Sequence, residues 1–136
     1  MNLPILEYDP DPRGILDPSM VPPRDVPEGC VLCFFGEVVE RLGREARPCF
    51  KLRSEQGTHV AYEIVHRGRR LAFFQPGVGA PLAAAFFEQA IARGCRRFAA
   101  CGGAGALVPE LALGHVVVPS AAVRDEGTSY HYLPPA

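Results

Sequence analysis

Three segments of the chain are rich in glycine or polar residues, and each follows an apolar stretch. They are the loop QPGVGAP at residues 75–81, the glycine cluster CGGAG at residues 101–105 and the segment RDEGTSYHY at residues 124–132. Glycines after an apolar strand mark a place where another group approaches the main chain closely. That group is either a ligand or a packed neighbouring element, because each segment alone is also typical of a tight turn.

The pair Cys30 and Cys33 has the CxxC spacing of a redox or zinc motif. Its context, GCVLCFFG, is instead typical of a buried strand, in which residues three apart point to opposite faces. No second CxxC or paired histidines complete a metal site, so we expect no bound metal. The five cysteines are expected to be buried, reduced thiols.

These residues need elements to position them, and hydrophobic periodicity predicts both helices and strands. Two helices are expected, one at residues 37–46 and one within residues 77–94, where Pro81 suits the first turn and Gly94 suits the position after the last. Strands are expected at residues 30–36, 48–55, 58–68, 69–77, from residue 95 into the glycine cluster, and at 114–123. Residues 1–29, which are rich in proline, are expected to form an irregular arm.

This order of elements predicts an α/β fold with a central mixed, largely parallel sheet. Ligands of such sheets bind beyond the carboxyl ends of the strands. The three segments rich in glycine or polar residues all follow strands, so we expect them to form the wall of one pocket at that edge. The strands at residues 70–76 and 97–102 are expected to pair in parallel.

Composition excludes several classes of partner. The 136 residues fit one domain, and the formal net charge of −1 argues against a nucleic-acid partner or an anionic membrane surface. No apolar run approaches the length of a membrane span. The N-terminus is acidic and rich in proline, unlike a signal peptide, so a cytoplasmic location is expected.

The run PGVGAPLAAAFFEQAIARGCRRFAACGGAGAL, followed by LGHVVVPSAAVRDEGTSYHYLPP, resembles the nucleoside phosphorylase and nucleosidase superfamily. The resemblance is good over residues 69–136 and loose over residues 27–68. It implies a three-layer sandwich, with helices on both faces of the sheet, over residues 30–136. It also implies glycosyl transfer from a purine or pyrimidine nucleoside to phosphate, with inorganic phosphate as co-substrate and no other cofactor.

The resemblance also implies which residues contact the nucleoside. The backbone of the glycine turn would lie against the ligand, which requires a wall without side chains. The implied substrate-binding residues are Val78, Gly79, Gly102, Gly103, Ala104, Gly105, Thr128, Ser129, Tyr130 and His131. For the glycine turn the structural alternative is tight packing of a helix on the sheet, and for residues 128–131 it is an exposed C-terminal tail.

Two departures from the family pattern concern the phosphate site. The family usually has an arginine two residues before the first glycine of the turn and a hydroxyl residue after that glycine, but this chain has Ala100 and Gly103. Arg41, near the first strand, is offset from the family's phosphate loop. Phosphate needs fixed positive donors, and this chain lacks the usual ones. Their lack favours hydrolysis by water as the alternative reaction.

The nucleosidase branch of the family uses a glutamate just after the first strand to activate water. By that resemblance Glu37 or Glu40 is the candidate general base. The structural alternative is that both residues lie on a solvated helix face, since an acid such as Glu37 is also favoured at a helix N-terminus.

Family members are longer than this chain, and the part that would follow residue 136 carries the ribose site and the acid that protonates the leaving base. The chain is therefore expected to be a first half, as a fragment, as a naturally short protein or with another chain supplying the rest. A non-catalytic nucleoside-binding or assembly module is the alternative from another class. Both the resemblance and the exposed apolar surface of a half-domain predict a homo-oligomer.

Overall fold

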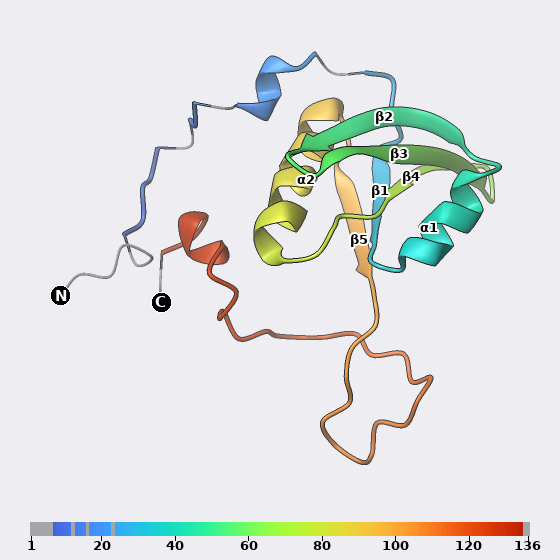
Figure 1. Ribbon diagram of the computed structural model, residues 1–136, viewed down its shortest axis with the longest axis vertical. Coiled ribbons are helices and arrows are strands. Elements are labelled where there is room, and N and C mark those ends of the chain that lie inside the picture. The colour runs from blue at the N-terminus through green and yellow to red at the C-terminus, as the bar shows by residue number, and fades with distance from the viewer. Residues whose placement is uncertain (1–6, 12, 16, 23, 135–136) are drawn as a thin grey trace.

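The computed structural model describes residues 7–11, 13–15, 17–22 and 24–134. Five strands form one sheet: β1 (Gly29–Cys33), β2 (Arg47–Ser54), β3 (Gly57–His66), β4 (Arg69–Phe74) and β5 (Arg97–Cys101). Two α-helices accompany the sheet, α1 (Gly36–Gly43) and α2 (Ala80–Arg93), and two short 3-10 helices lie outside it, η2 (Pro18–Met20) and η3 (Ser129–His131). Figure 1 shows the sheet above a long loop that follows β5.

The sheet has the strand order β2-β3-β4-β1-β5 (Figure 1). β1 pairs in parallel with both β4 and β5, whereas β2, β3 and β4 form an antiparallel meander. The predicted mixed sheet is therefore confirmed. β4 and β5 run parallel but are not direct neighbours, so the expected direct pairing of residues 70–76 with 97–102 is wrong. β1 lies between them and pairs with both.

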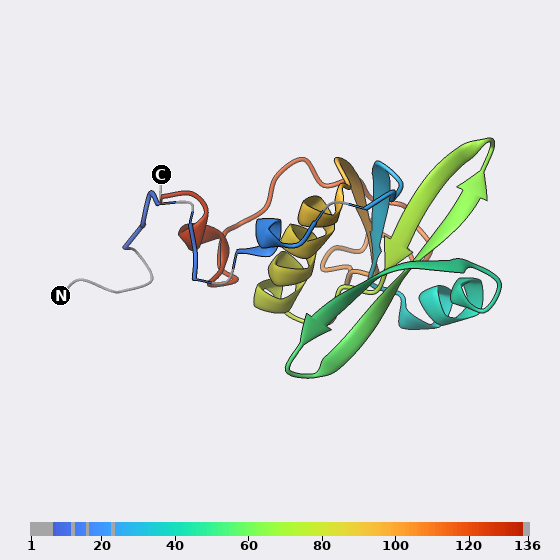
Figure 2. The ribbon, with the colours of Figure 1, turned by 90° about the horizontal axis from the view of Figure 1, so that it is seen from above.

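The two helices pack on opposite faces of the sheet (Figure 2). Phe86 and Ala90 of α2 pack in one core cluster with Cys30 of β1, and Val39 of α1 packs with Cys33 of β1 in a second cluster. The three-layer sandwich predicted from the family resemblance is confirmed by these two clusters. Cys30 and Cys33 lie on opposite faces of β1, as their spacing in a strand predicted.

Helix α2 begins and ends where its sequence predicted. Pro81 lies in the first turn, where its missing N–H is not needed, and Gly94 caps the last turn with a φ of 124°. Helix α1 is shorter than expected and ends at Gly43, because Arg47 already begins β2. No described helix has both the length and the apolar composition that crossing a lipid bilayer requires.

Residues 114–123 form no strand, which corrects the sequence-based expectation. They belong to an exposed loop from Gly102 to Val123, in which Val116 is 93% and Val118 is 87% exposed. A strand requires a neighbour for its backbone N–H and C=O groups, and among the described residues no strand pairs with this segment. The expectation that all cysteines are buried is also wrong, because Cys101 on the edge strand β5 is exposed.

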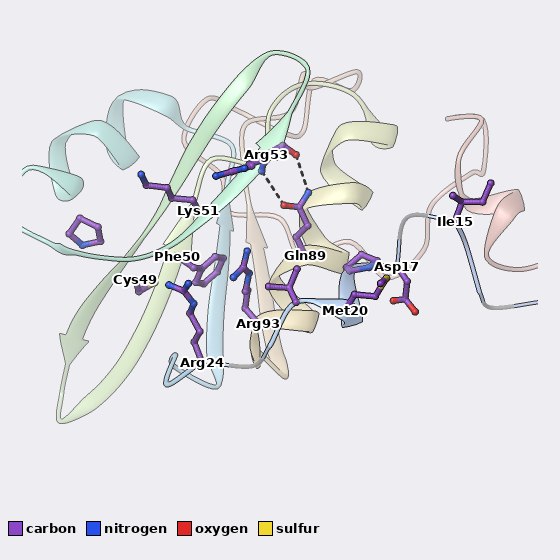
Figure 3. A pocket seen from close by; sticks show the side chains of 13 residues that line it. Ile15, Asp17, Met20, Arg24, Cys49, Phe50, Lys51, Arg53, Gln89 and Arg93 are labelled. Carbon is purple, nitrogen blue, oxygen red and sulfur yellow. Dashed lines mark hydrogen bonds between the residues drawn. The ribbon is translucent and has the colours of Figure 1, made fainter.

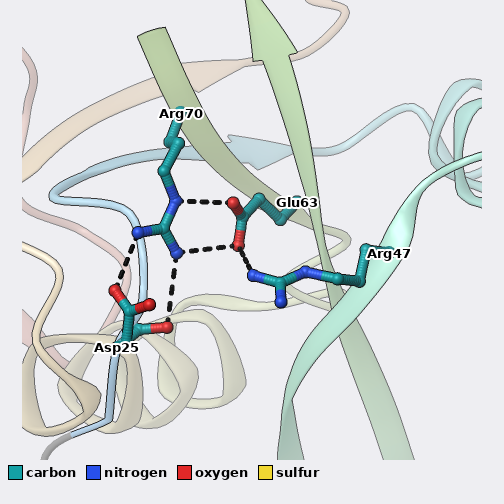
Figure 4. Close-up of polar contacts among 4 residues, drawn as sticks. All are labelled: Asp25, Arg47, Glu63 and Arg70. Atoms are coloured by element: carbon teal, nitrogen blue, oxygen red, sulfur yellow. Dashed lines mark hydrogen bonds and ion pairs between the residues drawn. The ribbon is translucent and has the colours of Figure 1, made fainter.

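The N-terminal arm is attached to the sheet by an ion-pair network (Figure 4). The carboxylate of Glu63 is 8% exposed and accepts hydrogen bonds from Arg70 Nε at 2.6 Å and Arg47 Nη2 at 2.7 Å. Arg70 Nη1 also donates to Asp25 Oδ1 at 2.7 Å. Hydrogen bonding to Arg70, followed by that to Arg47, holds the pKa of Glu63 below its usual value.

Candidate functional site

The glycine turn after β5 packs against the end of β1. Cys33 and Cys101 are register partners, and Phe34 N donates a hydrogen bond of 2.8 Å to Cys101 O. A Cβ atom added to Gly102 would lie 3.1 Å from Phe34 Cβ, which is tighter than an ordinary contact. At Gly102, therefore, the glycine allows a neighbouring loop to approach, so close packing explains this one position.

The rest of the turn faces open space. A Cβ atom on Gly103 would only reach ordinary contact with Phe35, at 3.6 Å, and one on Gly105 would meet nothing within 4 Å. Residues 102–105 are all exposed. Of the two explanations for the glycines, packing accounts for Gly102, whereas Gly103, Ala104 and Gly105 leave bare backbone that a ligand can contact.

A second glycine loop lies at the carboxyl end of β4. Gly77 and Gly79 have φ values of 81° and 94°, in the region that favours glycine, and a Cβ atom on Gly77 would collide with Leu82. Gln75 Oε1 accepts a hydrogen bond of 2.8 Å from Gly77 N, which fixes the turn. Val78 is 89% exposed. The loop thus presents Val78 and Gly79 outward at the same sheet edge as the glycine turn, since β4 and β5 both run parallel to β1.

The two candidate bases lie on the first helix after this edge. Glu37 occupies the first turn of α1, directly after the end of β1, and is exposed. Glu40 lies one turn later and pairs with Arg44 through a contact of 3.1 Å, with about three quarters of each side chain exposed. The geometry thus separates the two: Glu40 belongs to a solvated helix face, and Glu37 is the carboxylate nearer the sheet edge in the chain. Arg41 lies in the last turn, away from the end of β1.

Residues 124–134 form a compact loop that the hydrogen bonds of Arg124 close. This loop is called the C-terminal knot here, although the chain is not threaded through it. Its guanidinium donates to Ser129 Oγ at 2.9 Å and to the carbonyls of Leu133 and Pro134, and it lies 4.4 Å from the centre of the Tyr130 ring. The segment contacts the helical layer through Tyr132, whose hydroxyl donates to Glu88 on α2 at 2.9 Å.

The C-terminal knot lies apart from the glycine turn in both views (Figures 1 and 2). Thr128, Ser129, Tyr130 and His131 are therefore not brought together with Gly102–Gly105 in this structure, and their role in nucleoside binding stays a prediction. Within the knot, hydrogen bonds from Ser129 lower the pKa of Glu126 to about 2.

Two aromatic residues at this edge were not predicted as part of the site. Phe34 and Phe35 directly follow β1, are each about two fifths exposed and lie beside the glycine turn. The available sequence signal was the pair of phenylalanines immediately before a glycine at the end of an apolar run. No cluster of three or more His, Cys, Asp or Glu side chains suited to a metal ion occurs among the residues described.

The chain matches the family model of the phosphorylase superfamily over residues 29–136. It is 34% identical over 95 residues to a uridine phosphorylase of Thermococcus kodakarensis, covering 70% of this chain and 33% of the relative. It is also 36% identical over 74 residues to a guanosine phosphorylase of Halorubrum lacusprofundi, covering 52% of this chain and 31% of the relative. The chain thus spans about a third of the length of these relatives.

The fold has a counterpart among solved structures. The purine nucleoside phosphorylase of Toxoplasma gondii, solved in complex with immucillin-H, superimposes with a TM-score of 0.50 at 16% identity, over 63% of this chain and 34% of that one. At this identity the likeness concerns the fold. The family match, which includes the sheet, both glycine segments and the C-terminal knot, shows that this chain belongs to the phosphorylase superfamily.

Proposed function

We propose that the chain is the nucleoside-binding first part of a nucleoside phosphorylase-like protein that acts on the N-glycosidic bond of a purine or pyrimidine nucleoside. The observation that carries the proposal is the family match over residues 29–136, within which bare backbone at Gly103–Gly105 lies open at the carboxyl edge of the sheet. Phe34 and Phe35 beside it offer apolar faces to a base or sugar. Val78 and Gly79 are proposed to contact the ribose.

The acceptor of the glycosyl group is proposed to be inorganic phosphate, as the names of the relatives suggest. One observation favours water instead. The two positions of the turn that hold phosphate in the family are Ala100 and Gly103, and Arg41 lies at the far end of α1. With water as nucleophile, Glu37 would be the general base, because Glu40 is paired with Arg44 in solvent.

To test the proposal, the protein is incubated with uridine, inosine or guanosine, with and without inorganic phosphate. The products measured are free base, ribose 1-phosphate and free ribose. Ribose 1-phosphate formed only with phosphate supports phosphorolysis, and free ribose formed without phosphate supports hydrolysis. For hydrolysis we expect Glu37→Gln to abolish turnover and Glu40→Gln to leave it unchanged. Nucleoside binding without turnover in calorimetry supports the non-catalytic module, and no binding at all refutes the proposed function.

The binding surface can be mapped with matched variants. Gly105→Val fills open space and is expected to weaken nucleoside binding without lowering the melting temperature. Tyr130→Ala and His131→Ala test the C-terminal knot in the same assay. If Gly105→Val binds nucleoside as well as the parent does, the glycine turn is not the binding wall.

We also propose that the protein is a cytoplasmic homo-oligomer. The support is the exposed apolar loop after β5, where Leu107, Leu113, Val116 and Val118 are almost fully exposed. A second support is the outer edge of β5, which pairs with no strand in the described part of the chain. Light scattering over a wide concentration range tests the assembly, and a monomer throughout would contradict it. Cell fractionation tests the location.

A further inference from the structure

A cavity of about 670 Å³ lies away from the glycine turn, between the N-terminal arm, β2 and α2 (Figure 3). The arm contributes η2 and Arg24, β2 contributes Pro48 to Lys51 together with Arg53, and α2 contributes Gln89 and Arg93. Arg93 is the last residue of the 14-residue helix α2, whose first residue follows Gly79. At 1.5 Å per residue Arg93 is therefore about 20 Å along the helix from Gly79.

Four cationic side chains line this cavity: Arg24, Lys51, Arg53 and Arg93. The one acidic residue of the lining, Asp17, accepts a hydrogen bond of 2.8 Å from Ser19 N and caps η2. Within the described part of the chain, the ion pairs engage other arginines and none of these four cations. The eleven positions outside the described part carry no acidic side chain, since they are Met, Asn, Leu, Pro, Ile or Ala.

The four positive charges repel one another. The positive charges of Arg24 and Arg53, added to the larger effect of burial, lower the pKa of Arg93. The lining holds four positive charges against the single negative charge of Asp17. This excess of like charge raises the energy of the free protein, and a bound anion reduces the repulsion while accepting charge-assisted hydrogen bonds.

Hydrogen bonds anchor the main chain at three of these cationic residues. Gln89 Oε1 accepts from Arg53 N at 3.1 Å, and Gln89 Nε2 donates to Arg53 O at 3.1 Å, which fixes β2 to α2 (Figure 3). Arg24 N donates to Arg93 O at 3.1 Å, which fixes the arm to the end of the helix. The side chains of Arg24, Arg53 and Arg93 therefore extend from anchored backbone positions around one cavity.

The remaining lining is largely apolar and includes Met20, Val21, Pro48 and Phe50. We propose that this cavity binds a phosphorylated small molecule, whose phosphate groups contact the four cations and whose organic part lies against the apolar wall. The volume lies within the range of about 300–1,000 Å³ that small-molecule sites have. A polyphosphate chain suits the site better than a single phosphate, because the cations come from three separate elements.

Isothermal titration calorimetry with sodium tripolyphosphate, ATP and adenosine, in low-salt buffer without phosphate, tests the proposal on the 136-residue chain. We expect tripolyphosphate to bind with a stoichiometry of one and ATP to bind more tightly, because only ATP has an organic part. Arg53→Met and Arg93→Met keep the aliphatic stem and remove the charge, and each is expected to weaken tripolyphosphate binding about tenfold. Lys51→Met removes a positive charge from an exposed position of β2. It leaves the hydrogen bonds between Arg53 and Gln89, which link strand and helix, unchanged.

Arg69→Met is the matched control, since it removes one exposed arginine of β4 that does not line the cavity. Equal weakening by Arg69→Met, or no binding of tripolyphosphate to the parent protein, would overturn the anion site. Equal affinities for ATP and tripolyphosphate would overturn the role of the apolar wall. Adenosine binding that survives Arg53→Met and Arg93→Met belongs to the glycine-turn site, so a failure of the proposed nucleoside function is distinguishable from a failure of this proposal.

Discussion

Glu63 and Arg70, on the neighbouring antiparallel strands β3 and β4, form a two-point ion pair. Arg70 Nε lies 2.6 Å from Glu63 Oε1, and Arg70 Nη2 lies 3.2 Å from Glu63 Oε2. The glutamate is buried, whereas Arg70 extends toward solvent and also binds Asp25. One carboxylate thus joins β2, through Arg47, to β4 and to the N-terminal arm.

Glu63→Gln is expected to lower the free energy of unfolding by about 2 kcal/mol, because a charge-assisted network loses its buried acceptor. Urea denaturation followed by circular dichroism measures this change. Glu40→Gln is the matched control, since it breaks the exposed pair with Arg44 and is expected to cost less than about 0.5 kcal/mol. Equal effects of the two variants would show that the Glu63 network contributes no more than a surface pair.

The same carboxylate predicts how stability depends on pH. Its pKa in the folded protein lies below the ordinary value of 4.5, so its contribution is fully present above about pH 4.5. That contribution is lost as the pH falls through the folded pKa, because the unfolded chain takes up the proton first. Denaturation curves between pH 7 and pH 3 should show a steeper acid loss for the parent than for Glu63→Gln. Parallel pH profiles would contradict the shift.

The two glycines Gly77 and Gly36 should respond oppositely to alanine. Gly77 has a φ of 81° and no room beside Leu82, so Gly77→Ala is expected to destabilise the protein by about 1–2 kcal/mol. Gly36 begins α1 without a positive φ, and a Cβ there meets nothing within 4 Å. Gly36→Ala is therefore expected to stabilise the protein by about 0.5 kcal/mol, since it restricts the unfolded chain. Thermal unfolding of both variants measures the contrast.

Cys101 is expected to be the first thiol that reacts with a maleimide in the native protein. It is exposed, whereas Cys30, Cys33 and Cys95 are buried and Cys49 is half-buried. Desolvation and the neighbouring Cys33 raise the pKa of Cys101, so the labelling rate should keep rising above pH 9.0, the ordinary value. Mass spectrometry of the parent and of Cys101→Ser identifies the labelled residue. Rapid labelling of the serine variant would refute the assignment.

Local signals allowed much of the fold to be predicted. Pro81 and Gly94 delimit α2 by their own backbone preferences, and the two-residue turn at 55–56 sets the β2–β3 hairpin. Cys30 and Cys33 were placed on opposite faces by strand geometry alone. In the site, the glycine segments were found because glycine signals bare backbone wherever it occurs.

Features that depend on distant partners could not be predicted. The valines at residues 116–118 have strand propensity, but a strand needs a neighbouring strand, and propensity does not supply one. The exposure of Cys101 follows from the position of β5 at the sheet edge, which depends on strand order. The Glu63 network and the four-cation cavity both join residues that are far apart in the chain, so no local pattern revealed them.

The position of β1 between β4 and β5 has a consequence for the order in which the chain folds. β1 is made early, yet both of its partners, β4 and β5, follow later in the sequence, whereas β2, β3 and β4 are joined by short turns. During synthesis β1 therefore has no strand to pair with until β4 has been made. The meander can form first, since closing its short loops costs the least entropy. We expect pulse-labelled hydrogen exchange to detect protection in the meander first, then in β1, and last in β5, whose partner in the sheet is β1.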